Sequence, residues 1–458
     1  MTTVAEADIA ALFHPYTNLV RHPETGPLVI VRGEGVRVFD EAGKDYIEGL
    51  AGLWCTTLGW GEQRLAEVAA AQMRELPFYH LFSSKAHTPG VRLAEALAEL
   101  APVPDAKVFL ACSGSEANDT AIKMIWYRNN ALGRPEKKKL IARERAYHGV
   151  TVATGSLTGL PVNQRGFDLP IDRVLHTGCP HYWRYAEKGE SEEQFSARRA
   201  EELEKLILAE GPETVAAFFA EPVMGAGGVI VPPAGYFEKI QAVLKKYDVL
   251  LVADEVITGF GRTGNMFGSQ TFGLKPDMMT VAKGLSSGYL PISALIVAGH
   301  VYEPIKRQSG EIGVFGHGLT YGGHPVPAAV ALETLKIYAE RDIVAQVRRT
   351  APVLQDGLRA LQQHPLVGEA RGLGLIGALE LVADKDAKTP FDPKLAVGAR
   401  VVAKAQEHGV ILRAMGDTIA FAPPLIISED EIRDLLARFR RGLDEAHGEL
   451  VAAGAVSQ

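Results

Sequence analysis

The chain has 458 residues, which is long enough for two domains and a large hydrophobic core. Its hydrophobic fraction of 47% and charged fraction of 22% are ordinary for a globular enzyme, and its net charge of -7 argues against a nucleic-acid partner. No run approaches the roughly 18 apolar residues of a membrane span. Three cysteines are too few for a disulfide scaffold, and Met1–Ala11 lacks a secretion-signal pattern, so we expect a cytoplasmic protein.

The elements, taken in chain order, predict an α/β fold. Short strands within Val29–Gly49 indicate a small antiparallel meander. Between about residues 105 and 300, apolar strands alternate with helical patterns, including a helix that begins near Ser191. This alternation predicts a mostly parallel central sheet with helices on both faces. The predicted strands are Val108–Ala111, Leu140–Ala142, Val215–Ala220, Val249–Ala253, Met279–Ala282 and Ser293–Val297.

The pattern changes after Pro325 to long amphipathic helices with short strands, such as Ile376–Leu381 and Thr418–Phe421. This change predicts a second, smaller α/β domain. We therefore expect a large domain over residues 71–325 and a small domain over residues 326–458. We expect the N-terminal segment, residues 1–70, to pack with the small domain.

A Gly/Ser turn joins the strand Val108–Ala111 to a helix with an apolar face. Gly114 lets the backbone approach a ligand closely, while Ser113 and Ser115 offer hydroxyl groups. The N-terminus of a helix presents unpaired N–H groups and partial positive charge, which suit a phosphate. The alternative is ordinary capping of the helix by serine, and this motif alone does not decide between them.

Tyr147 and His148 follow the strand Leu140–Ala142, so they are expected at the rim of the sheet. An aromatic ring there can stack on a flat cofactor, a contact worth roughly 0.5–1.5 kcal/mol beyond the burial of its area. Alone, the motif is weak, since a tyrosine in this position is more often part of the core.

Two further apolar strands end in charged residues. Asp254 and Glu255 follow Val249–Ala253, and Lys283 follows Met279–Ala282. Open α/β sheets bind ligands at the carboxyl ends of their strands. Pyridoxal phosphate needs a lysine there for a Schiff base, and a carboxylate that keeps its ring nitrogen protonated. A lone lysine at a strand end is usually structural, but the pair and the phosphate signal together predict this cofactor.

Other cofactors are disfavoured. Gly259–Gly264 and Gly372–Gly377 match the glycine spacing of a dinucleotide site, but neither glycine run is predicted to open a helix, as that site requires. The sequence has no Walker-type phosphate loop. It also has no His/Cys cluster with zinc spacing, so no metal site is expected.

Over about residues 15–424, the chain resembles the class III pyridoxal-phosphate-dependent aminotransferases. Leu251–Gly264, continuing to Lys283, is similar to the family's long lysine signature. Ser113–Ala117 and Tyr147–Gly149 are similar to its phosphate-binding and ring-stacking motifs. The resemblance implies a fold-type I homodimer with two active sites at the subunit interface. It leaves open whether dimers pair into tetramers.

The resemblance also implies roles for individual residues. Lys283 would carry the cofactor and move a proton from the α-carbon of the substrate, and Asp254 would stabilise the protonated ring. Reaction with an amine and then with a keto acid is ping-pong kinetics. Further cofactor contacts are implied for Ser113, Gly114, Ser115, Tyr147, His148, Glu221 and Ile257, and for Thr320, which would reach the phosphate of the neighbouring subunit.

Four positions bear on the substrate, together with Tyr147. Trp54 and Phe82 resemble the aromatic pocket walls of the ω-amine:pyruvate subgroup, although each could instead be core packing. Arg413 resembles a mobile arginine that binds a substrate carboxylate. Ala226 stands where ornithine- and γ-aminobutyrate-type relatives carry a glutamate that holds this arginine aside. These residues favour pyruvate as the acceptor and an amine without an α-carboxylate as the donor.

Other readings stay open within the same family. A 2-oxoglutarate-dependent diamine or ω-amino acid aminotransferase, an aminomutase and a decarboxylase would all use Lys283 and Asp254. A catalytically silent regulator that binds the cofactor is disfavoured, because the chain retains Lys283, Asp254 and Tyr147. The sequence does not identify the physiological amine.

Overall fold

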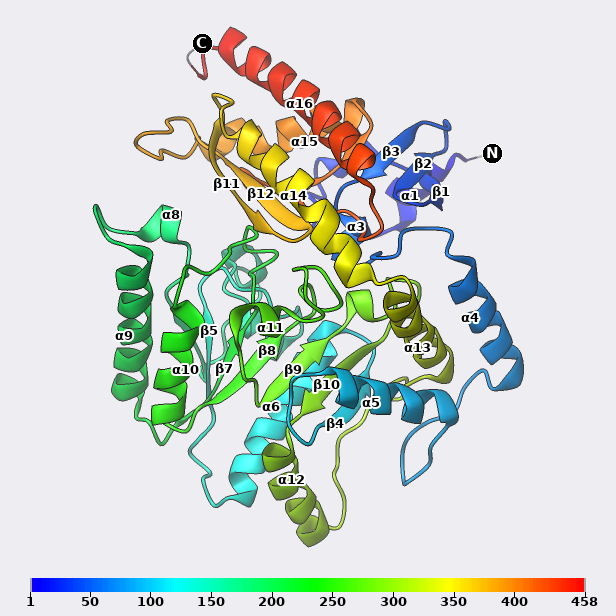
Figure 1. Ribbon diagram of the computed structural model, residues 1–458, viewed down its shortest axis with the longest axis vertical. Helices are drawn as coiled ribbons and strands as arrows, with labels where there is room; N and C mark the ends of the chain where they lie inside the picture. Colours follow the sequence, from blue (N-terminus) through cyan, green and yellow to red (C-terminus); the bar gives the residue numbers. More distant parts are fainter. Residues whose placement is uncertain (1, 457–458) are drawn as a thin grey trace.

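The computed structural model describes residues 2–456 and contains one large and two small sheets. In Figure 1, the large sheet and its helices occupy the lower part of the molecule, and the small sheets with α14, α15 and α16 lie above it. Both termini lie at this upper end. Among residues 2–456, no helix is long and apolar enough to cross a membrane.

The central sheet has seven strands in the order β4-β10-β9-β8-β7-β5-β6. Only β10 runs antiparallel to its neighbours, so the predicted mostly parallel sheet is confirmed. The sequence analysis missed β6, a strand of four residues whose second half, His176 and Thr177, is polar. The strands are β4 (Lys107–Ala111), β5 (Lys139–Arg143), β6 (Val174–Thr177), β7 (Val215–Ala220), β8 (Leu250–Asp254), β9 (Met278–Val281) and β10 (Ser293–Val297).

Helices cover both faces of this sheet, because the central strands are apolar on both sides. Phe219 of β7 and Val252 of β8 point into the core that α6 covers, while their neighbours Phe218 and Leu251 point into the core under α9 and α10. Ser113 and Ser191 cap α6 and α9. The helices around the sheet are α5 (Thr88–Leu100), α6 (Gly114–Ala131), α7 (Val152–Leu157), α9 (Glu192–Glu210), α10 (Tyr236–Lys246) and α12 (Gly299–Ile312).

The C-terminal part forms an antiparallel sheet in the order β11-β12-β15-β14, on which α14 packs. The predicted strands Ile376–Leu381 and Thr418–Phe421 coincide with β12 and β15. The remaining elements here are β11 (Val367–Leu373), β13 (Val410–Ile411), β14 (Arg413–Met415), α13 (Pro325–Glu340), α14 (Ile343–Leu361), α15 (Val397–Glu407) and α16 (Glu429–Ala452).

The N-terminal meander shares a sheet with this C-terminal part. Its strands pair in the order β1-β2-β3-β13, and Ile47 of β3 lies opposite Val410 of β13. α13, in contrast, packs on α4 and α5. The domain limits at residues 70 and 325 stay a prediction. The N-terminal elements are α1 (Val4–Ala11), α2 (His22–Thr25), β1 (Ile30–Glu34), β2 (Arg37–Asp40), β3 (Asp45–Glu48), α3 (Ala51–Trp54) and α4 (Gln63–Glu75).

Candidate active site

The carboxyl ends of β7, β8 and β9 and the N-terminus of α6 surround a cavity of roughly 410 Å³, the inner cavity. Glu221 follows β7, Asp254 ends β8, and Lys283 follows β9 after one residue. Because these three strands are parallel neighbours, their last residues meet at one edge of the sheet. The structure thus brings the predicted lysine and carboxylates into one cavity.

Asp254 is buried and held as an ionised acceptor. Its Oδ2 accepts hydrogen bonds from His148 Nδ1 and from the side-chain amide of Asn118, both at 2.8 Å, and its Oδ1 accepts one from the backbone N–H of Val256 at 3.1 Å. Burial would raise the pKa of Asp254, but the hydrogen bonds from His148 and Asn118 outweigh it and lower that pKa below its usual value. The carboxylate therefore presents a fixed negative charge to the cavity.

Lys283 lies in the same cavity with backbone φ at +46°, in the left-handed region that non-glycine residues rarely adopt. Burial lowers the pKa of the Lys283 amine, against the opposing attraction of Asp254. A lowered pKa increases the share of neutral amine at any given pH, and only the neutral amine is a nucleophile or a base.

The turn before α6 lines one end of the inner cavity, and this is the end that is expected to bind phosphate. Ser113 Oγ accepts the N–H of Glu116 at 3.2 Å, and Ser115 Oγ accepts the N–H of Val150 at 3.2 Å, so each hydroxyl still has its own proton to donate. A Cβ on Gly149 would lie only 2.6 Å from Ser115 Oγ, and the φ of Gly149 is +134°. Gly149 thus permits the close approach of its loop to Ser115.

Three more predicted residues line the inner cavity. Tyr147 is half-buried, with its backbone N–H bonded to Glu221 Oε1 at 3.0 Å, while Glu221 Oε2 accepts the N–H of Gly225 at 2.9 Å. Burial raises the pKa of Glu221 above its usual value. Ile257 lines the same cavity. Glu221 therefore ties the loop that carries Tyr147 to the end of β7.

A second cavity of roughly 930 Å³, the outer cavity, adjoins the inner one and shares Leu53, Tyr147, Ile257 and Lys283 with it. Trp54, Ala226 and Arg413, three of the predicted substrate residues, line it. They come from α3, from the loop after β7 and from β14, so the outer cavity lies between the central sheet and the upper part of the molecule.

Arg413 begins β14 and is half-buried in the outer cavity. Its guanidinium lies 5.9 Å from the ring centroid of Tyr16. Within residues 2–456, it forms no salt bridge with a carboxylate. Tyr16 is also hydrogen-bonded to Asn163, so an aromatic ring and a cation stand together at the mouth of the cavity.

Trp54 reaches the outer cavity through an irregular loop. Its φ is +67°, and Gly52 before it has a φ of +70°, so the short helix α3 is kinked. Glu48, at the end of β3, is buried and accepts the N–H of Gly52. Burial raises the pKa of Glu48 to about 8. A buried carboxyl group therefore holds the loop that carries the tryptophan.

Phe82 and Thr320 lie outside both cavities of this chain. Phe82 is exposed and lines a separate surface hollow with Gly318, where a Cβ would lie 2.8 Å from the phenyl ring. Thr320 is exposed two residues further on. The structure thus places neither residue in a cavity with Lys283 of the same chain.

Sequence reasoning missed two residues that the structure brings to the cavities. Asn118 stands one helical turn after Ser115 and bonds Asp254, a spacing that could have suggested its role. Tyr16 lies in an irregular segment with no periodic signal.

Glu255, in turn, faces away from Asp254, because its carboxylate accepts the N–H groups of Gly268 and Ser269.

These residues fit pyridoxal phosphate. The helix N-terminus and serine hydroxyls suit its phosphate, Tyr147 suits its ring, and the anion of Asp254 suits its protonated ring nitrogen. Lys283 supplies the amine that the cofactor's aldehyde requires.

Comparison with known proteins gives consistent results. The family model described as Aminotransferase class-III matches residues 20–443. The chain is 52% identical over 432 residues to the protein named γ-aminobutyrate transaminase 3, chloroplastic, of Solanum lycopersicum, covering 94% of this chain and 83% of that protein. It is 51% identical over 424 residues to γ-aminobutyrate transaminase 1, mitochondrial, of Oryza sativa subsp. indica, covering 92% and 82%.

The similar solved structures carry a different name from these curated relatives, since they are called ω-transaminases. The ω-transaminase of Pseudomonas jessenii in complex with PMP is 56% identical, with a TM-score of 0.97 over 98% of this chain and 99% of that one. A thermostable sixfold mutant from the same organism is 57% identical, with a TM-score of 0.96 over 97% and 98%. Both sets of relatives are thus named transaminases, and only the names of the curated relatives state a substrate, γ-aminobutyrate.

Proposed function

The chain belongs to the class III aminotransferases, which are enzymes that use pyridoxal phosphate, and on that premise we propose which substrates it takes. The donor is an ω-amino acid or an amine without an α-carboxylate, and the acceptor is pyruvate. One observation carries this proposal: Arg413, a half-buried arginine without a carboxylate partner among residues 2–456, lines the same outer cavity as the small Ala226.

Each residue of the inner cavity has a task in this proposal. When bound, pyridoxal phosphate supplies an aldehyde carbon and an electron-accepting ring. Lys283, whose pKa is lowered by burial, accepts the proton of the substrate α-carbon as a neutral amine and later returns it. Asp254, kept ionised by His148 and Asn118, holds the proton on the ring nitrogen. Ser113, Gly114 and Ser115 hold the phosphate, with Tyr147 and Ile257 against the ring.

The outer cavity must accept two unlike substrates in turn. The donor amine carries no carboxylate next to its reacting carbon, whereas the acceptor keto acid does. Trp54 and Tyr147 offer apolar surface for the amine. Only a cation can take the carboxylate of pyruvate without leaving a buried charge unpaired. Arg413 serves this step, and no glutamate at position 226 competes for it.

A second donor deserves a test, because the curated relatives are named γ-aminobutyrate transaminases. γ-Aminobutyrate lacks an α-carboxylate, so it falls within the proposed donor class, and its own acid group would occupy Arg413. The acceptors separate the readings more sharply. We expect pyruvate to complete the cycle faster than 2-oxoglutarate. Besides Arg413, two cations line the described outer cavity: Lys283, which the cofactor requires, and Arg145, whose Nε already donates to the carbonyl of Gly227. A second carboxylate would have to compete for one of them.

Single-turnover absorbance can test this proposal in two halves. Enzyme is first reduced with 1-phenylethylamine or γ-aminobutyrate, and return of the cofactor signal is then followed after pyruvate or 2-oxoglutarate is added. The proposal requires return with pyruvate. Faster return with 2-oxoglutarate would replace it with a 2-oxoglutarate-dependent aminotransferase, and turnover without any keto acid would indicate an aminomutase or a decarboxylase.

We further propose that the working unit is a homodimer in which Phe82 and Thr320 complete the active site of the second copy. Both residues are exposed and lie away from Lys283 of their own chain. Thr320→Ala should weaken cofactor retention by roughly 10- to 200-fold, the worth of one charge-assisted hydrogen bond. A fully active monomer in sedimentation would refute the shared site.

Subunit mixing tests this arrangement more directly. A heterodimer of Lys283→Ala and Thr320→Ala chains holds one site with both changes and one site with neither. At a cofactor concentration that loads intact sites but not Thr320→Ala sites, mixing should therefore restore activity that each parent lacks. A mixture no more active than the parents would contradict the shared site.

The free thiols Cys55, Cys112 and Cys179 support a reducing compartment, and a cytoplasmic location stays part of the proposal.

A further inference from the structure

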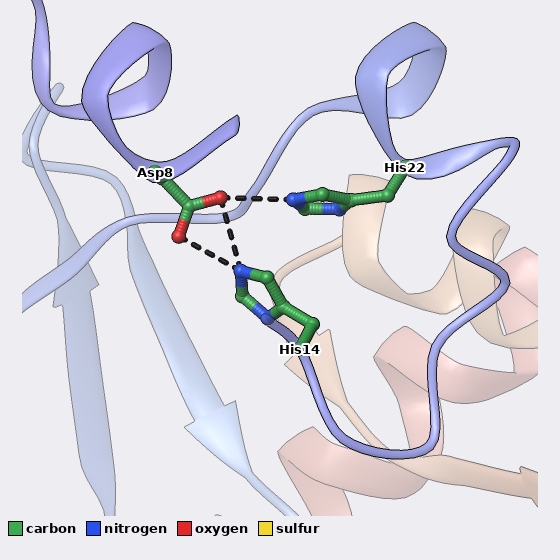
Figure 2. A group of neighbouring side chains, drawn as sticks. All are labelled: Asp8, His14 and His22. Carbon is green, nitrogen blue, oxygen red and sulfur yellow. Dashed lines mark hydrogen bonds and ion pairs between the residues drawn. The ribbon is translucent and has the colours of Figure 1, made fainter. Parts of the chain in front are cut away.

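Three side chains near the N-terminus converge on one point outside the two cavities. Figure 2 shows the carboxylate of Asp8, on α1, facing the imidazole rings of both His14 and His22. Asp8 Oδ1 lies 2.8 Å from His14 Nε2, and Asp8 Oδ2 lies 2.9 Å from His22 Nε2. The two imidazole rings are 4.3 Å apart. Both imidazole nitrogens thus contact the same carboxylate, and the three ligand atoms lie within 4.8 Å of one another.

Local structure fixes each of these groups. A capping box formed by Thr3 and Glu6 starts the helix that carries Asp8. Each histidine is followed by a proline, which restricts the backbone of the residue before it. Asn18 accepts backbone N–H groups at the turn that leads into His22. The cluster is therefore positioned by its own segment of the chain.

A second His/Glu cluster in the described part of the protein provides a contrast. His181 lies beside Glu369 and Glu380, but the guanidinium of Arg371 bonds both carboxylates and Arg184 bonds Glu380. Two cations already neutralise that cluster. Asp8, by comparison, forms ion pairs only with its two histidines among residues 2–456. A metal ion would meet no competing cation of the chain there.

We propose that Asp8, His14 and His22 form a binding site for a divalent transition metal of the zinc type. Zinc takes imidazole nitrogen and carboxylate oxygen at about 2.0–2.2 Å in a tetrahedron, whose edges are then about 3.3–3.5 Å. The observed contacts of 2.8–3.0 Å between these atoms need to open by only a few tenths of an ångström. Water takes the fourth position.

The sequence analysis predicted no metal site, because it searched for closely spaced ligands. These three ligands stand six and eight residues apart, on a helix, a loop and a second short helix, and no standard zinc spacing covers them. Only the fold of the N-terminal segment brings them together.

The site has a consequence for the outer cavity, because Tyr16 lies in the loop between the two histidine ligands. α1 itself contains no buried residue, so few apolar contacts hold this segment in place. A metal ion that joins α1 to both ends of the loop closes it as a cross-link does. It thereby fixes the position of Tyr16 beside Arg413.

Calorimetric titration of the dialysed holoenzyme with zinc chloride tests the site. We expect one ion per chain, with affinity at least about 10- to 100-fold weaker in Asp8→Asn, since even loss of a hydrogen bond to a metal ligand costs this much. Glu24→Gln removes an equal charge near His22 from an exposed position and should leave the affinity unchanged. Equal affinity in wild type and Asp8→Asn, or an equal loss in both variants, would overturn the proposal.

Hydrogen exchange separates a metal site from a simple cluster of ion pairs. Zinc should slow exchange of the amides over residues 12–22 in wild type, but not in His14→Gln or His22→Gln. Cobalt should give the ligand-field absorption of a low-symmetry site at wavelengths longer than those of the cofactor. Protection that is the same with and without zinc in wild type would mean that hydrogen bonds alone hold this segment, and would overturn the metal assignment.

Discussion

The inner and outer cavities share Lys283 and Tyr147 but are built in opposite ways. The inner cavity stands on the ends of parallel strands and the start of one long helix, and its carboxylates are buried and hydrogen-bonded. The outer cavity is formed by loops, an edge strand and the N-terminal segment, with Tyr16 and Trp54 in left-handed backbone conformations. The first is held by the sheet, and the second by contacts between irregular segments that are far apart in the sequence.

This difference indicates how the two tasks are divided. A group that must hold a proton at a fixed atom needs a rigid support, which strand ends provide. A pocket that must accept two unlike substrates in turn needs side chains that can move, and loops permit this. Changes in the inner cavity should therefore stop the chemistry, whereas changes in the outer cavity should alter the choice of substrate.

Replacing Lys283 by alanine should have the largest effect. Loss of the proton-transfer group costs about 10²–10⁴-fold, and loss of the covalent link to the cofactor adds to this. Both half-reactions should fail together, whatever the substrate. Borohydride reduction followed by peptide mapping should place the cofactor on Lys283 in wild type and in the exposed control Lys205→Ala. Retention of a reducible link in Lys283→Ala would show that another lysine carries it.

The next prediction concerns Glu48. This buried carboxyl group supports the loop that carries Trp54 into the outer cavity. Burial raises its pKa to about 8, from an ordinary 4.5. The folded chain thus keeps a proton that the unfolded chain releases between about pH 5 and 8, so stability is lost as pH rises through this window. A difference of about 3.5 pKa units, at about 1.4 kcal/mol each, limits the effect to about 5 kcal/mol.

Glu48→Gln keeps an acceptor for Gly52 without the titration. Its thermal midpoint relative to wild type should therefore rise steadily from pH 5 to pH 8, when both proteins are compared at equal concentration. Glu41→Gln, at an exposed position, provides the control and should follow wild type. A constant offset across this range would mean that Glu48 does not hold a proton in the folded chain.

The same contrast explains what the sequence could predict. Apolar strands that end in charge predicted β7, β8 and β9, and parallel pairing then brought Asp254 and Lys283 together. No periodic pattern marks Tyr16, and nothing local shows that it meets Arg413, which lies almost four hundred residues away. The roles of Phe82 and Thr320 depend on a second copy of the chain. Long-range contacts between irregular segments are therefore what sequence patterns left out.

Arg413→Ala should separate the two half-reactions. We expect the pyruvate half-reaction to lose about 10- to 200-fold, the worth of one hydrogen-bonded charge pair, while the half-reaction with 1-phenylethylamine changes much less. Single-turnover absorbance measures each half on its own, with the exposed Arg359→Ala as the control. Equal losses in both halves would mean that Arg413 supports the fold of β14 and does not bind the acid.

The smallest expected effect comes from adding a carboxylate to the outer cavity. Ala226 and Arg413 both line it, and Arg145 and Arg371 hold the backbone of the loop after Ala226 by bonding Gly227 and Gly228. A glutamate at position 226 can pair with the guanidinium when no keto acid is present, and pyruvate must then displace it. A partly exposed pair is worth up to about 1 kcal/mol, so the pyruvate half-reaction should slow by up to about 5-fold.

Two matched variants make this small effect interpretable. Ala226→Gln has the size of the glutamate without its charge, so it reports the steric part alone. In the Arg413→Ala background, Ala226→Glu should lose its additional effect, because the competing pair no longer exists, and the double-mutant cycle measures this coupling. If Gln and Glu slow the pyruvate step equally, or if the effect of Glu survives without Arg413, position 226 acts through pocket volume and the absence of a glutamate does not decide the acceptor.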